Sequence, residues 1–282
     1  MSSWAARWLP AWDDFRGRLG SLARRKRRIY LKDEQELALM RSAGALVADT
    51  LRRLRDRVRP GITTGELDRI AEEYIRAHNG VPSFKGYHGF PASACISVNE
   101  QVVHGIPGPR RLHEGDVVSI DVGAIVGGYH GDAAVTLPVG KISEEARALL
   151  YHTYRSLYEG IAQAVNGKRI GDISFAVQRY VEAHGYSVVR EMVGHGIGRS
   201  MHEEPQVPNF GPPGRGPILV PGMTLAIEPM INQGTADIEV AADQWTVSTS
   251  DGKLSAHFEH TVAIGRDGPI ILTRWPENEE PI

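Results

Sequence analysis

The sequence has little cysteine, no long apolar run and almost no net charge. Cys95 is the single cysteine among 282 residues, so no disulfide can form within the chain, and a reducing, cytoplasmic location is expected. No apolar run approaches the roughly 18 residues that a membrane-spanning helix needs, so no membrane association is expected. Arg7 and Pro10 interrupt the N-terminal segment before the apolar core of a secretion signal, about 7–15 residues long, could form.

Charged residues are unevenly distributed along the chain. The first 32 residues contain nine Lys or Arg against two Asp, a net charge of +7, which leaves −9 for a remainder that brings the total to −2. We therefore predict a basic, flexible N-terminal extension over 1–32 and a single globular domain over 33–282. Five of the six residues in 23–28 are basic, which is typical of a solvated tail and also of a weak contact with a polyanion.

Apolar periodicity predicts a mixed α/β chain. A helix is expected after Asp33, its candidate N-cap, and a second helix is expected to end at Gly80. Further helices are predicted near 143–165 and 171–184, and strands near 94–99, 117–125 and 132–138. The part after residue 188 is expected to consist mostly of short strands and Gly/Pro loops.

Two segments that lie 106 residues apart resemble each other. In each, a Gly-x-x-x-Gly loop leads into a helix that is followed by a strand region. Two copies suggest a pseudo-twofold domain with its site between the halves, because a solenoid needs three or more copies. The matching pairs are Gly61/Gly167, Gly65/Gly171, Glu66/Asp172, Leu67/Ile173, Tyr74/Tyr180, Ile75/Val181, Ala77/Ala183 and His78/His184.

The stretch SIDVGAIVGGYHGDAAVT, residues 119–136, predicts a β-hairpin that carries two carboxylates. A two-residue turn at 127–128 places Asp121 opposite Ala134 and makes Asp132 its diagonal neighbour on the same face. Diagonal Cβ atoms lie about 7–8 Å apart, so the two carboxylates resist burial unless cations lie between them. The aspartates could also cap turns or pair with arginine, and the hairpin alone does not decide between these structures.

Three further polar residues stand in apolar or glycine-rich surroundings. His195 lies in the predicted loop MVGHGIGRSMHEEP, Glu228 in the predicted strand MTLAIEPM, and Glu259 in the predicted strand SAHFEHTVAI. Together with the two aspartates they form an oxygen-rich set with one imidazole. Such a set suits two divalent ions such as Mn, Fe, Co or Zn, whereas a single structural zinc would prefer several thiolates.

The order and context of these motifs resemble the type I methionine aminopeptidases. The shared motifs are His104 in NEQVVHGIP, the two aspartates eleven residues apart, GHGIG, IEP and FEHT, and the resemblance covers about residues 33–275. It implies the pita-bread fold, a pseudo-twofold α/β (α+β) domain with an antiparallel β-sheet core covered by two pairs of helices. It also implies cotranslational removal of the initiator methionine from nascent peptide N-termini when the second residue is small.

The resemblance implies a ligand set for two divalent ions, which could be Co, Mn, Fe, Zn or Ni. Asp121 would bind one ion, His195 and Glu228 would fall mainly to the other, and Asp132 and Glu259 would bridge the two. Glu228 would also move a proton.

The resemblance also implies a set of substrate contacts. His104 and His202 would be the two catalytic histidines that contact the substrate without binding metal. Phe84 and Met201 stand where common bacterial relatives have cysteine and phenylalanine, which leaves the shape of the methionine pocket open. Tyr87 and Phe90 could equally be plain core. The apolar pocket is predicted to comprise Tyr87, Phe90, Cys95, Met201 and Trp245.

Other classes of protein share this fold and are alternatives to this prediction. The type II enzymes carry a long insertion between the positions of His202 and Glu228, which only 25 residues separate here. The remaining alternatives are an X-Pro aminopeptidase or prolidase and a binding protein without catalysis. We further expect a monomer and a weak contact between the basic extension and ribosomal RNA.

Overall fold

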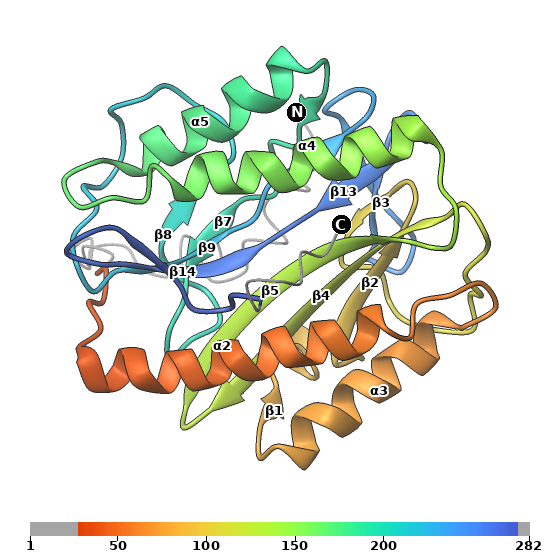
Figure 1. Ribbon diagram of the computed structural model, residues 1–282, viewed down its shortest axis with the longest axis horizontal. Coiled ribbons are helices and arrows are strands. Elements are labelled where there is room, and N and C mark those ends of the chain that lie inside the picture. Colours follow the sequence, from red (N-terminus) through yellow and green to blue (C-terminus); the bar gives the residue numbers. More distant parts are fainter. Residues whose placement is uncertain (1–27, 276–282) are drawn as a thin grey trace, which may run out of the picture.

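In the computed structural model, residues 28–275 are described, and most of the predicted extension lies outside them. Two pairs of helices cover opposite sides of a set of antiparallel strands (Figure 1). This arrangement confirms the predicted α+β pita-bread architecture. Within 28–275, no helix is both long and apolar enough to span a membrane. The helices are α2 (Glu34–Arg55) and α3 (Thr64–Ala77) on one side and α4 (Glu144–Ile161) and α5 (Ile170–Ala183) on the other.

Within residues 28–275 the strands form four sheets, ordered β1-β4-β2 with β5 on β4, β13-β10-β6, β11-β12-β3 and β15-β14-β9-β7-β8. Neighbouring strands in these sheets run antiparallel. The strands are β1 (Val81–Pro82), β2 (Ala94–Val98), β3 (Gln101–Val103), β4 (Val117–Val126), β5 (Tyr129–Pro138), β6 (Ser187–Val188), β7 (Gly194–Gly196), β8 (Glu203–Val207), β9 (Thr224–Ile227), β10 (Met230–Asn232), β11 (Ile238–Val240), β12 (Val247–Thr249), β13 (Ser255–His257), β14 (His260–Ile264) and β15 (Pro269–Ile271).

Helix α2 begins where the sequence predicts. The Asp33 side chain accepts from the backbone N–H of Glu36, and the Glu36 side chain accepts from the backbone N–H of Asp33. This capping box satisfies two donors that the first helical turn leaves unpaired. Ile29 packs against the hydrophobic core and Lys32 is buried, so part of the segment that we predicted as an extension belongs to the folded domain.

The two predicted repeats are equivalent in structure. Helices α3 and α5 have 14 residues each and begin 106 positions apart. The first turn of each helix is held in the same way: Gly65 N–H donates to the backbone carbonyl of Gly108 at 2.8 Å, and Gly171 N–H donates to that of Arg215 at 2.9 Å. The repeat therefore marks two halves of one domain.

The hairpin has the predicted register. Strands β4 and β5 pair Asp121 with Ala134, and the turn residues Gly127 and Gly128 have φ of 58° and 83°. Both turn residues need the left-handed region that glycine enters without steric cost, as the turn of a two-residue hairpin requires. The hairpin thereby places both aspartates on one face.

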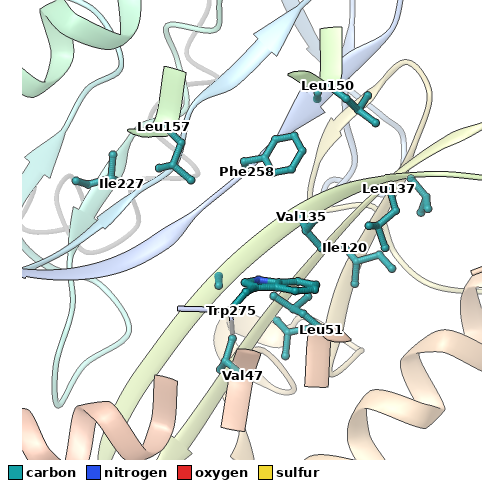
Figure 2. Close-up of a cluster of buried hydrophobic side chains, with 14 of the residues drawn as sticks. Val47, Leu51, Ile120, Val135, Leu137, Leu150, Leu157, Ile227, Phe258 and Trp275 are labelled. Carbon is teal, nitrogen blue, oxygen red and sulfur yellow. The ribbon is translucent and has the colours of Figure 1, made fainter. Parts of the chain in front are cut away.

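A continuous hydrophobic core fixes the hairpin against the helices. Figure 2 shows Leu51 of α2, Ile120 of β4 and Leu150 of α4 within one cluster of buried side chains. At one point the helix touches the sheet almost directly, since a Cβ on Gly131 would lie 2.7 Å from the backbone nitrogen of Gly44. This contact lies one residue before Asp132, so α2 supports the strand that carries it.

Candidate functional site

A cavity of about 480 Å³ opens beside the central strands, and every site residue predicted from the sequence lines it. The residues come from both halves of the chain, as the pseudo-twofold repeat suggested. Phe84, a position that departs from common relatives, lines it too. The predicted residues are Tyr87, Phe90, Cys95, His104, Asp121, Asp132, His195, Met201, His202, Glu228, Trp245 and Glu259.

Two backbone links hold Asp132 and Glu259 next to each other. The N–H of Asp132 donates to Thr261 Oγ1 at 3.0 Å, and the same hydroxyl donates to Asp132 O at 2.8 Å. The N–H of Glu259 donates to Ala134 O at 2.9 Å. Thr261, from the second half of the chain, thus positions Asp132, and Ala134, from the first half, positions Glu259.

The prediction that Glu228 and Glu259 lie inside strands is wrong. Strand β9 ends at Ile227, and Glu228 stands before Pro229, which has no N–H to continue a ladder. Glu259 lies in the break between β13 and β14. Both carboxylates therefore leave the regular pleat at the cavity wall.

The prediction that His195 lies in a loop is also wrong. His195 is the middle residue of β7, which pairs with β8 and β9. A Cβ on Gly194 would lie 2.4 Å from Ala226 O, and one on Gly196 would lie 2.2 Å from Glu204 O. The glycines therefore allow a strand to pass very close to its neighbours, and the sequence alone did not distinguish this requirement from that of a loop.

The ligand-type atoms converge on the floor of the cavity. One such atom each from Asp132, His195 and Glu259 lie within 4.8 Å of one another, and His195 Nε2 lies 3.5 Å from Glu228 Oε1. Asp121 Oδ1, Asp132 Oδ1 and Glu259 Oε1 are buried without a hydrogen-bond partner. Among residues 28–275, no Lys or Arg forms an ion pair with any of the four carboxylates.

This arrangement strongly disfavours ionised carboxylates. Burial raises the pKa of Asp121 to about 7. Burial, followed by repulsion from neighbouring carboxylates, raises the pKa of Asp132, Glu228 and Glu259 well above the usual range. Divalent cations between the oxygens would reverse this effect, because they favour the charged form.

Three histidines of the cavity, His104, His195 and His202, are expected to be neutral at physiological pH. Burial lowers the pKa of His104 and of His195 to about 4. The ring of His202 is open to the cavity, yet its pKa lies well below the usual value. The first cause is desolvation by the surrounding protein, and the second is repulsion from the imidazoles of His195 and His104. The Tyr87 hydroxyl lies 2.7 Å from His202 Nδ1. A hydroxyl that donates to Nδ1 leaves the proton of the neutral ring on Nε2.

The other end of the cavity is apolar. Phe84, Phe90, Cys95 and Met201 belong to one buried cluster, against which Tyr87 and Trp245 pack. The rings of Phe90 and Trp245 meet edge to face at 5.0 Å. This end offers an uncharged wall for an unbranched apolar side chain, with the polar floor beside it.

His257 and Asn209 belong to the site but were not predicted from the sequence. His257 lines the cavity and places Nε2 3.8 Å from Glu228 Oε2, and Asn209 Nδ2 donates to Glu228 O at 2.9 Å. The spacing of His257 and Glu259 offered a signal, because residues two apart on an extended segment share a face. No local pattern singles out Asn209.

Comparison with known proteins gives the family. The profile described as "Metallopeptidase family M24" matches residues 38–266. The methionine aminopeptidase of Clostridium perfringens is 59% identical over 87% of this chain and 98% of its own length. Methionine aminopeptidase 1 of Bacillus subtilis is 55% identical over 87% of this chain and 99% of its own length. The chain belongs to the methionine aminopeptidases of metallopeptidase family M24.

Solved structures agree with this family. The methionine aminopeptidase of Rickettsia prowazekii superposes with a TM-score of 0.87 at 42% identity, covering 88% of this chain and 100% of that one. Prolidase from Pyrococcus furiosus shares the fold, with a TM-score of 0.71 at 19% identity, but this chain covers only 66% of it. Membership of a metallopeptidase family implies a divalent metal, and the partnerless carboxylate oxygens of this methionine aminopeptidase fit one.

The metal-free protein should therefore become more stable when one of these carboxylates is removed. Asp121→Asn is expected to raise the Tm of the metal-free protein strongly at pH 8 and much less at pH 4. The folded pKa of Asp121, about 7, exceeds the ordinary value of 3.8. The folded state thus binds more protons between these values, and the carboxylate lowers stability as pH rises through this range. The gain should be about 2–4 °C per kcal/mol of strain relieved.

Thermal unfolding in the presence of a chelator measures this difference. Comparing variant with wild type at each pH cancels the buried histidines, which act in the opposite direction below pH 6.5. With metal restored, the order should invert, because Asp121→Asn would remove one of the predicted metal ligands. A lower Tm for metal-free Asp121→Asn at pH 8 would contradict the assignment of a strained carboxylate.

Proposed function

We propose that the protein hydrolyses the first peptide bond of nascent chains that begin with methionine, using two divalent metal ions. The observation that carries the proposal is the meeting of four carboxylates, of which those of Asp132 and Glu259 are buried, with His195 in a cavity whose far end is apolar. The names of relatives more than 50% identical over nearly their full length support the same activity.

The proposed ligands follow the geometry of the floor. Asp132 and Glu259 would serve both ions, Asp121 would hold one of them, and His195 and Glu228 would hold the other. When bound, the ions would supply the electrophilic activation that peptide hydrolysis at neutral pH requires. Which metal works in the cell depends on availability as well as affinity.

The remaining residues handle the substrate. A Glu228 oxygen takes a proton from the attacking water and returns it to the amide nitrogen, which leaves as an amine when the carbon–nitrogen bond breaks. His202 donates from Nε2 to the carbonyl oxygen as that oxygen gains charge. His104 contacts the substrate backbone near the amide nitrogen. The cluster of Phe84 and Met201 receives the methionine side chain.

Peptide hydrolysis tests the proposal and its specificity. Met-Ala-Ser should be cleaved, as should peptides with Gly, Ser, Thr, Pro, Val or Cys in second place. Peptides that begin Met-Lys, Met-Leu or Met-Trp should resist, because a site closed over the second residue lacks room for a large side chain. Release of free methionine is measured after metal stripping and anaerobic reloading with each ion. Efficient cleavage of Met-Lys or Leu-Gly peptides would reject the specificity.

The same assay separates the alternatives. An X-Pro aminopeptidase would release Ala from Ala-Pro peptides, and a binding protein would release nothing with any metal. Because one chain supplies every residue of the described site, a monomer suffices for the activity. Because nascent chains are the proposed substrates, we also propose a cytoplasmic location.

The basic extension is proposed to contact ribosomal RNA weakly. Its residues 1–27 lie outside the described part, and the support is their charge, against a strongly acidic remainder. Deleting 1–27 should lower co-sedimentation with ribosomes at low salt, because basic residues bind phosphates largely through counterion release. The kcat/KM on Met-Ala-Ser should stay within about twofold, since no site residue is lost. Equal co-sedimentation of the truncated protein would leave the extension without this role.

A further inference from the structure

Lys32 joins the start of the folded domain to the segment that follows His202. Its N–H donates to Gly222 O at 2.8 Å, and its ammonium donates to Glu203 Oε2 at 2.5 Å and to Tyr30 O at 3.2 Å. The two side chains of the ion pair are 5% and 8% exposed. Burying two charges is costly in desolvation, so a buried pair is weak evidence for a purely stabilising role.

The ion pair packs against the turn between β7 and β8. The other oxygen of Glu203 accepts from Ser200 N at 3.2 Å, and the N–H of His130 donates to Gly198 O at 2.8 Å. A Cβ on Gly198 would lie 2.4 Å from Lys32 Cε and 2.7 Å from Glu203 Oε1. The lysine stem and the carboxylate thus occupy the space that a side chain at Gly198 would need, and the turn rests directly on the ion pair.

The same turn ends in two residues of the cavity. Met201 belongs to the apolar cluster, and the ring of His202 lies 4.2 Å from that of His195. Glu203 follows His202 directly and begins β8. Any reorientation of Glu203 is therefore transmitted through one peptide bond to the histidine that faces the substrate.

We propose that Lys32 is a positioning residue whose ion pair with Glu203 fixes the turn that presents His202 and Met201 to the substrate. The pair also neutralises Glu203, an acidic side chain of the cavity wall in addition to the four carboxylates of the floor. Without Lys32, Glu203 would be a buried charge with no cation and would turn toward solvent or toward the metal ligands. The kinetic part of this inference rests on the proposed peptidase function.

Three variants test the pair by activity. Lys32→Met keeps the length of the stem, Glu203→Gln keeps an oxygen for Ser200 N–H, and the third variant combines both. The kcat on Met-Ala-Ser should fall roughly 10- to 100-fold in each single variant, the size expected when a catalytic group is misplaced by about 1 Å. KM should change less than about threefold, and metal content should stay at the wild-type value. The double variant should lose less than the product of the two single losses, because the partners act as one unit.

A matched control separates positioning from stability. Leu54→Ala removes a fully buried side chain of α2 outside the cavity and should lower Tm without lowering kcat at a temperature where the protein stays folded. Amide hydrogen exchange, which needs no activity, should accelerate over 198–202 in Lys32→Met and not in Leu54→Ala. A kcat of Lys32→Met within twofold of the control, or unchanged exchange over 198–202, would overturn the inference. If the wild type cleaves no peptide, the proposed function fails, and the exchange result alone decides on the positioning role.

Discussion

Replacing Asp132 with asparagine should remove at least one bound divalent ion and lower turnover on Met-Ala-Ser at least about a hundredfold. Asparagine keeps the shape of the side chain and the backbone link to Thr261, but it deletes one negative charge and one oxygen that is proposed to bind metal. Metal activation contributes several kcal/mol to peptide hydrolysis, and each 1.4 kcal/mol is about tenfold in rate. Glu259→Gln should behave alike, because it removes the matching oxygen on the other side of the floor.

The control is a carboxylate on the neighbouring part of the fold. Asp68 accepts from the backbone N–H groups of Ser93 and Ala94 at 2.8 and 2.9 Å and does not line the cavity. Asp68→Asn should cost stability and retain both metal and turnover. Metal analysis of the purified proteins and steady-state kinetics are the two measurements. Two bound ions and near-normal kcat in Asp132→Asn would refute its role as a bridge.

The parts of the site that follow from local rules could be predicted from the sequence. A two-residue glycine turn fixes the pairing of β4 with β5, and this pairing alone brings Asp121 and Asp132 to one face. The 106-residue repeat can be recognised for a similar reason, because each copy carries its own short Gly-x-x-x-Gly pattern at the start of a helix. Both features depend on residues close together in the chain.

The parts that depend on distant contacts could not be predicted. The GHGIG motif is typical of a glycine-rich loop. Gly194 and Gly196 are needed, however, because Ala226 O and Glu204 O lie within 2.4 Å of the positions that their Cβ atoms would occupy. Glu228 reads as a strand residue, although Pro229 offered a local signal that the ladder would stop. The Lys32–Glu203 pair joins residues 171 positions apart, and no sequence pattern around either residue predicts it. Such contacts arise from packing between the two halves.

The second large effect is expected at His202. In His202→Ala, kcat on Met-Ala-Ser should fall roughly 10²- to 10³-fold, the loss typical of one donor to a developing oxyanion. Metal content should stay at the wild-type value, because the ligand set on the floor is intact. KM should change far less than kcat, since a donor that acts mainly in the transition state contributes little to ground-state binding. Loss of metal in this variant would make His202 a ligand and overturn the assignment.

The neighbouring tyrosine gives an independent check on the same role. The Tyr87 hydroxyl lies 2.7 Å from His202 Nδ1, and by donating there it would keep the proton of the neutral ring on Nε2, where a donor is needed. Tyr87→Phe should therefore lower kcat in the wild-type background by a smaller factor, and should lower it no further in the His202→Ala background. If the two losses multiply instead, Tyr87 acts on the substrate directly. If Tyr87→Phe raises only KM, Tyr87 serves to line the methionine pocket and does not affect the protonation of His202.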